Sequence, residues 1–101
     1  MKYNKLVRDK IPEIIRNNGD KCNTRMLDDS EYIDALNNKL LEEAREFIDS
    51  QDIEELADLE EVILSILEFK NSSREELDEI RKNKVLKRGS FKKRVFLIDT
   101  N

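Results

Sequence analysis

The sequence predicts an all-α protein, a small antiparallel helical bundle that is completed by oligomerisation. Of its 101 residues, 42% are charged and 38% hydrophobic, and only two are Gly and one is Pro. This composition favours helices and lacks the turn residues that a β-sandwich or barrel needs. The apolar residues also recur at helical spacing, which argues against disorder. A chain of this length forms a single domain over residues 1–101 and buries a modest fraction of its surface, so we expect it to self-associate.

The first 27 residues are predicted to hold one short helix. Pro12 fits the first turn of a helix over residues 13–18. Gly19 suits the position that follows a helix end, where the backbone turns left-handed. Residues 21–27 place Cys22, Thr24 and Met26 in alternation and are predicted to be extended.

The first long helix is predicted to begin at residues 28–31, Asp-Asp-Ser-Glu, which supply an N-cap and a first turn rich in acids. Its apolar face consists of Ile33, Leu36, Leu40, Ala44 and Phe47, with Ile48 at the edge. Glu43 lies about 90° from the centre of this face, at the core boundary, where a partner helix can meet it. Glu42 points away from the core and is expected to meet water.

A turn over residues 49–52 is predicted to lead into a second long helix, from Ile53 to about Phe69. Asp52 and Glu55 form a capping-box pattern, so Glu55 is either a cap that bonds the backbone or a group that faces outward. The helix is apolar on nearly every side and should be buried on most of them. One chain has too few other helices to cover it, so we expect a second copy to do so.

The C-terminal third is predicted to hold one further helix. Ser73 and Glu76 form another capping-box pattern, which opens a helix through about Val85. Residues 82–94 contain seven bases and no acid, and residues 94–98 are predicted to form a short strand. This strand would pair with residues 21–27 or with another subunit.

Nothing in the sequence predicts export or membrane insertion. The first residues contain no apolar stretch typical of a signal peptide, and no apolar run is long enough to span a bilayer. The single Cys22 cannot form an internal disulfide and fits a reducing compartment. We therefore expect a cytoplasmic protein without a membrane partner.

The net charge of −4 hides a strong segregation. Residues 28–61 hold 14 acids and two bases, whereas residues 1–27 and 62–101 each carry a net charge of +4. An acidic centre between basic ends suits a metal ion together with an anionic ligand. The alternative is that these charges simply coat helix surfaces.

Two acidic pairs fall on the two long predicted helices. Glu43 and Glu46 lie three residues apart, as do Glu55 and Asp58, so each pair projects two carboxylates from one side of its helix. Four oxygen ligands in a chain without histidine favour Mg²⁺ or Mn²⁺ over zinc or a di-iron centre. Because Mg²⁺ usually shares its ligands with substrate phosphates, and the chain has no Walker-type loop, phosphate recognition would depend on the metal and on basic side chains.

The same residues resemble a known family. Glu42-Glu43-x-x-Glu46 followed by Glu55-x-x-Asp58 is similar to the signature of the MazG-type all-α nucleoside triphosphate pyrophosphohydrolases, which are related to phosphoribosyl-ATP pyrophosphohydrolase. Three further stretches resemble a small branch of this family, which consists of predicted house-cleaning enzymes: Asn4 to Pro12, Lys39-Leu40 and Arg88-Gly89-x-Phe91. Only eight residues separate Glu46 from Glu55, fewer than in larger MazG domains.

The resemblance implies a function and a set of roles. The implied reaction is attack of a metal-activated water between the α- and β-phosphates of a nucleoside triphosphate, standard or modified, which gives a nucleoside monophosphate and pyrophosphate. The implied ligands of Mg²⁺, with Mn²⁺ as an alternative, are Glu43, Glu46, Glu55 and Asp58. The residue implied to orient the water is Glu42 or Glu61. The candidate phosphate contacts are Lys39, Arg8, Lys10, Arg88 and Lys93, each of which also fits a solvated surface charge.

Two other classes of protein stay open. One is a nucleic-acid-binding helical protein that uses the basic residues 82–94, although the chain is acidic overall and this strip holds only Phe91 as an interior aromatic residue. The other is a non-catalytic helical oligomer whose acids are surface groups and caps. The sequence favours the enzyme, acting as a homodimer or homotetramer on a nucleoside triphosphate.

Overall fold

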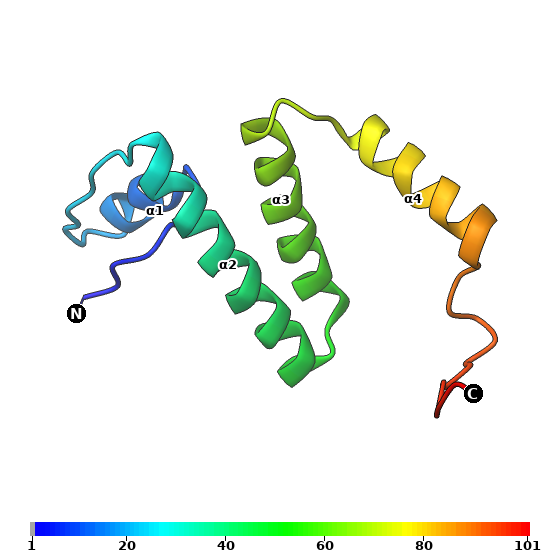
Figure 1. Ribbon diagram of the computed structural model, residues 1–101. Coiled ribbons are helices and arrows are strands. Elements are labelled where there is room, and N and C mark those ends of the chain that lie inside the picture. Colours follow the sequence, from blue (N-terminus) through cyan, green and yellow to red (C-terminus); the bar gives the residue numbers. More distant parts are fainter. Residues whose placement is uncertain (1) are drawn as a thin grey trace.

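The computed structural model describes residues 2–101 and is all-helical, as the sequence predicts. Figure 1 shows α2 and α3 as an antiparallel hairpin, with α4 leading away from it. Among the described residues, α2 and α3 are the two helices that pack extensively against each other. The helices along residues 2–101 are α1 (Ile11–Asn17), α2 (Asp29–Ser50), α3 (Ile53–Phe69) and α4 (Arg74–Arg88).

The start of α2 confirms the predicted N-cap. Asp28 accepts a hydrogen bond from the backbone N–H of Glu31 at 2.8 Å, and the Glu31 carboxylate accepts one from the Asp28 N–H at 3.4 Å. Arg25 adds a two-pronged contact to the same carboxylate, at 3.2 and 2.7 Å. The helix ends at Gln51, whose φ of 61° is left-handed and turns the chain toward α3.

The start of α3 resolves the two interpretations of Glu55. Asp52 makes no side-chain cap, and its own N–H donates to the Ser50 hydroxyl at 3.1 Å. The predicted capping box of Asp52 and Glu55 is therefore wrong, because the Ser50 hydroxyl already accepts the hydrogen bond of the Asp52 N–H within the tight turn. The Glu55 carboxylate is left to face α2.

The core lies between α2 and α3. Leu36 and Val62 are its buried apolar residues, with 2% and 7% of their surface exposed. Tyr32 and Phe69 meet edge to face, with ring centroids 5.7 Å apart. The rest of the predicted apolar face of α2 is half-buried apart from Ile48, which is exposed at its edge. On α3, Ile53 and Leu56 are exposed, so one chain leaves this helix incompletely covered. The coverage of α3 by a second copy stays a prediction.

The helix α4 extends three residues beyond the predicted end. Ser73 caps it by accepting from the Glu76 N–H at 3.1 Å, as expected. Basic residues in its last turn favour the longer helix, because they interact well with the C-terminal end of the helix dipole. Gly89, with a φ of 83°, ends it. No residue of α4 is buried.

The two predicted strands are absent from residues 2–101. Residues 21–27 and 94–98 have no paired partner, and a single extended segment is not stable without one. Arg94 also adopts a left-handed φ of 58°, which interrupts an extended run at its first residue. Phe96 is consequently 88% exposed.

None of the helices in the described part of the chain is long and apolar enough to cross a membrane.

Candidate metal centre

Three of the predicted ligands come together on the α2–α3 hairpin. Glu43 of α2 and Glu55 and Asp58 of α3 each offer a carboxylate oxygen, and these oxygens lie within 4.8 Å of one another. Glu55 and Asp58 share one side of α3 because they are three residues apart. The tight turn at residues 51–52 brings that side against Glu43. We call these three residues the carboxylate cluster.

Glu43 is the buried member of the cluster. It is only 7% exposed, and its Oε2 has no hydrogen-bond partner, while its Oε1 lies 3.6 Å from Lys39 Nζ. Burial raises the pKa of Glu43, and the carboxylates of Glu46 and Asp58 raise it further against the opposing charge of Lys39. A buried carboxylate oxygen without a partner is costly unless a cation meets it. The oxygen-only donor set therefore fits Mg²⁺ or Mn²⁺.

Glu46 lies at the edge of the cluster. It is exposed, and its oxygens are not among the three that approach within 4.8 Å. Its carboxylate nevertheless raises the pKa of Glu43 and of Glu55, so it lies close to both. For Glu55 the largest cause of the raised pKa is burial, followed by the charges of Glu46 and Asp58. The place of Glu46 as a fourth ligand stays a prediction.

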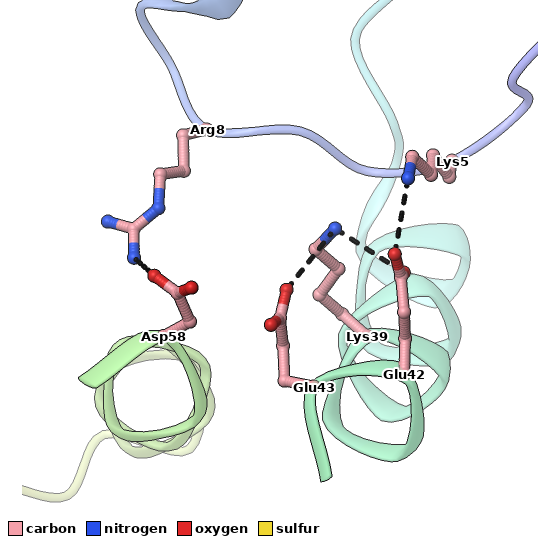
Figure 2. A network of polar contacts seen from close by, with 6 residues as sticks. All are labelled: Lys5, Arg8, Lys39, Glu42, Glu43 and Asp58. Carbon is pink, nitrogen blue, oxygen red and sulfur yellow. Dashed lines mark hydrogen bonds and ion pairs between the residues drawn. The ribbon is translucent and has the colours of Figure 1, made fainter. Parts of the chain in front are cut away.

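The N-terminal segment, residues 2–10, crosses over the hairpin and carries two cations to it (Figure 2). Arg8 reaches α3 and bonds Asp58 Oδ1 at 2.7 Å. Lys5 reaches α2 and bonds Glu42 Oε1 at 3.1 Å. Both pairs are partly exposed, so each contributes at most about 1 kcal/mol to stability. A member of the carboxylate cluster therefore has an arginine as its present counter-ion.

Glu42 does not face open water, contrary to the expectation. Its two oxygens contact Lys5 at 3.1 Å and Lys39 at 3.3 Å. Burial acts to raise the pKa of Glu42, but the hydrogen bonds and charges of these lysines outweigh it and lower the pKa. The same pairing raises the pKa of Lys5. Glu42 is therefore an ionised carboxylate held beside the cluster, because the N-terminal segment covers its side of α2.

Lys39 links the two groups of acids. Its Nζ lies between Glu42 and Glu43, one turn along α2 from each (Figure 2). Lys5, Lys39 and Glu42 also border a hollow of about 90 Å³, which is completed by Asn4, Leu6, Ala35 and Asn38. Cationic side chains and carboxylates thus alternate across the same face of the hairpin.

The remaining predicted residues make no ion pair with the cluster in the described part of the chain. Lys10 precedes α1, Arg88 ends α4, and Lys93 lies in the C-terminal segment. All three are exposed, as is Glu61, and none has an ion pair within residues 2–101. Of the five candidate phosphate contacts, Arg8 and Lys39 therefore pair with acids of the cluster in a single chain, and the other three do not.

Sequence reasoning missed two contacts. Lys5 was not a candidate, although it belongs to the same stretch as Arg8 and precedes it by three residues. Glu60, which had no assigned role, pairs with Arg74 at 2.6 Å and ties the start of α4 to α3. Both contacts join segments distant in the sequence, and no local pattern reports them.

Comparisons of the chain with protein-family models, curated proteins and solved structures gave no match.

Proposed function

We propose that this chain is a Mg²⁺-dependent nucleoside triphosphate pyrophosphohydrolase of MazG type, which hydrolyses its substrate between the α- and β-phosphates to a nucleoside monophosphate and pyrophosphate. The observation that carries the proposal is the carboxylate cluster, three carboxylates from two helices with oxygens within 4.8 Å of one another. The unpartnered Oε2 of Glu43 supports it, because a buried anionic oxygen needs a cation nearby.

The cluster would hold the cation through Glu43, Glu55 and Asp58, with Glu46 beside them. Bound Mg²⁺ would neutralise phosphate charge and lower the pKa of a water molecule that it carries. The chain's own acids make a second contribution, because Glu42 is kept ionised by Lys5 and Lys39. An ionised carboxylate at the edge of the cluster can accept a proton from an attacking water or hold that water in place.

The anionic substrate would be held by the cations on the same face. Arg8 bonds Asp58 through one guanidinium nitrogen, and a guanidinium offers a planar fork that suits phosphate oxygens. Lys39 lies 3.6 Å from Glu43 and is mostly buried, so its charge is weakly screened. Positioned cations that stabilise charge on a transferring phosphoryl group are a large part of such catalysis.

The enzyme would act in the cytoplasm and as a homo-oligomer. The oligomer is supported by the partly uncovered α3, on which Ile53 and Leu56 are 79% and 41% exposed. The cytoplasm is supported by the single free Cys22 and by the intracellular location of nucleoside triphosphates.

The test is pyrophosphate release from a panel of standard and modified nucleoside triphosphates with Mg²⁺. Wild-type protein should release pyrophosphate from at least one of them. Glu43→Gln and Asp58→Asn should each lose at least about 100-fold in rate, because each removes a charged ligand. Glu54→Gln, the same chemical change one residue from Glu55, should retain the wild-type rate. No release from any nucleotide would refute the proposed reaction, and full activity in both cluster variants would refute the metal assignment.

A further inference from the structure

We infer that α4 and the C-terminal segment, residues 74–98, form an arm that docks on the α2–α3 hairpin of a second copy of this chain. The arm has no buried residue in α4, and its apolar side chains stand in water. Leu86, Phe91 and Ile98 are 84%, 97% and 87% exposed. An exposed apolar surface of this extent marks an interaction site.

The exposed surface area of the chain is larger than that of a compact protein of the same mass. A folded chain of 12.0 kDa is expected to expose about 6,000 Å². This chain exposes 9641 Å², and its radius of gyration is 18.0 Å against about 13 Å for a compact domain of its length. The excess exceeds the roughly 800 Å² that each partner contributes to a standard interface. The arm and the hairpin together therefore carry enough surface for a stable contact.

Charge identifies the occupant as another copy of this chain. Residues 28–61, which cover α2 and the first nine residues of α3, hold 14 acids and two bases, whereas residues 82–94 of the arm hold seven bases and no acid. The two surfaces attract each other, and both belong to every copy. The hairpin also offers exposed apolar residues to meet those of the arm, since Leu41 and Ile48 are seven residues apart on α2 and are 58% and 66% exposed.

The connection between α3 and α4 explains why the arm does not fold back onto its own hairpin. The Ser72 N–H donates to the Leu67 carbonyl at 2.8 Å, and Asn71 adopts a left-handed φ of 58°. Ser73 caps α4, and Arg74 pairs with Glu60 at 2.6 Å. These contacts fix the direction in which α4 leaves the hairpin, and Figure 1 shows it diverging from α3.

Docking in this way would also bring the arm's bases to the site of the partner copy, a consequence that rests on the proposed function. Arg88 and Lys93 are candidate phosphate contacts, yet neither has an ion pair in the described part of its own chain. When the arm of one copy docks on the hairpin of the other, these two bases would face the carboxylate cluster that holds the cation. Each site would then combine carboxylates from one copy with bases from the other.

The mass of the full-length protein in solution tests the docking. Light scattering after size exclusion at micromolar concentration should give at least twice 12.0 kDa. The double variant Phe96→Ser with Ile98→Ser should weaken self-association at least tenfold, and its monomer should fold normally because both side chains are already exposed. Met26→Ser is the matched control, 95% exposed but outside the arm, and should associate as the wild type does. A monomeric wild type, or a double variant that associates normally, would overturn the inference.

A zero-length carbodiimide cross-link identifies the surfaces. It joins lysines to carboxylates in direct contact, and a mixture of isotopically labelled and unlabelled protein separates links between copies from links within one. We expect links between copies from lysines of residues 82–94 to acids of residues 28–61. Links confined to single chains, or links between copies that avoid the arm, would contradict the docking.

The shared site has its own test, whose failure is separate. Asp58→Asn lacks a cluster ligand, and Arg88→Ala with Lys93→Ala lacks the arm's bases. If both are inactive alone, an equal mixture should recover about one quarter of wild-type activity, because half the dimers are mixed and each has one intact site. No recovery from two inactive parents would refute the shared site. An inactive wild type would refute the proposed reaction, while mass and cross-links would still decide the docking.

Discussion

Replacing Glu43 by glutamine removes one negative charge from the carboxylate cluster and keeps the shape of the side chain. Two unit charges 4.8 Å apart interact by about 3.5 kcal/mol at an effective dielectric constant of 20. Lys39, 3.6 Å from Glu43, offsets much of the repulsion from Glu55 and Asp58. We therefore expect the metal-free variant to be more stable than the wild type by about 1–2 kcal/mol at neutral pH.

This gain should appear as a higher melting temperature. A change of 1 kcal/mol shifts the Tm of a domain of this size by about 4–8 °C, so metal-free Glu43→Gln should melt about 4–16 °C above the wild type. The order should reverse with Mg²⁺. A ligand at 100 times its Kd stabilises a protein by about 2.7 kcal/mol, which raises the Tm of the wild type by about 10–20 °C. The variant should gain little, because it has lost a charged ligand.

The assay is thermal denaturation followed by circular dichroism, at one protein concentration, with EDTA and with a Mg²⁺ series. Glu54→Gln is the control and should match the wild type in both conditions, because it makes the same change outside the cluster. A metal-free Glu43→Gln protein that is less stable than the wild type would refute the electrostatic reasoning. Equal Mg²⁺ stabilisation of variant and wild type would show that Glu43 is not a ligand.

Three further predictions address the surroundings of the cluster. Arg8→Gln should tighten Mg²⁺ binding up to about fivefold in calorimetric titration, since an exposed ion pair with Asp58 is worth at most about 1 kcal/mol; unchanged or weaker binding would contradict competition between Arg8 and the metal. Asp28→Ala should lower the Tm by about 4–8 °C because it removes the cap of α2, whereas Asp52→Ala should change it much less, since Asp52 makes no side-chain cap. The third concerns pH: the pKa of Glu31 is lowered from 4.5, chiefly by its hydrogen bond from Arg25, so its stabilisation is present above pH 4.5 and is lost as pH falls through the lowered pKa. Glu31→Gln should therefore be less stable at neutral pH and lose less stability than the wild type below pH 4.5, and parallel Tm curves for the two proteins would contradict this assignment.

Local chemistry made the helices predictable. Asp28 with Glu31 and Ser73 with Glu76 are spaced for capping, and both caps form where the sequence places them. Asp52 with Glu55 shows the limit of such a pattern, because the same spacing gives no cap when a neighbouring hydroxyl already satisfies the Asp52 N–H. The prediction of the two strands was wrong for another reason. A strand depends on a distant partner, and residues 94–98 have none among the described residues.

In the site, too, the features set by local periodicity could be predicted and the contacts between distant segments could not. The carboxylate cluster was predictable because helical periodicity places Glu55 and Asp58 on one side of α3 and Glu43 at the core boundary of α2. The cations around it were only partly predictable. Arg8 was a candidate, but its contact with Asp58 spans 50 residues, and the cover of Glu42 by Lys5 spans 37. The path of the N-terminal segment decides both contacts, and it is a property of the tertiary fold.

The central claim is that this carboxylate cluster supports cleavage between the α- and β-phosphates of a nucleoside triphosphate. Phosphorus NMR of the reaction tests it most directly, because it identifies which bond is broken. With Mg²⁺ and a nucleotide that the protein accepts, the signals of a nucleoside monophosphate and pyrophosphate should grow together in equal amounts, and should be absent with EDTA or with Glu43→Gln. A nucleoside diphosphate with inorganic phosphate, or an unchanged spectrum for every nucleotide in the panel, would contradict the claim.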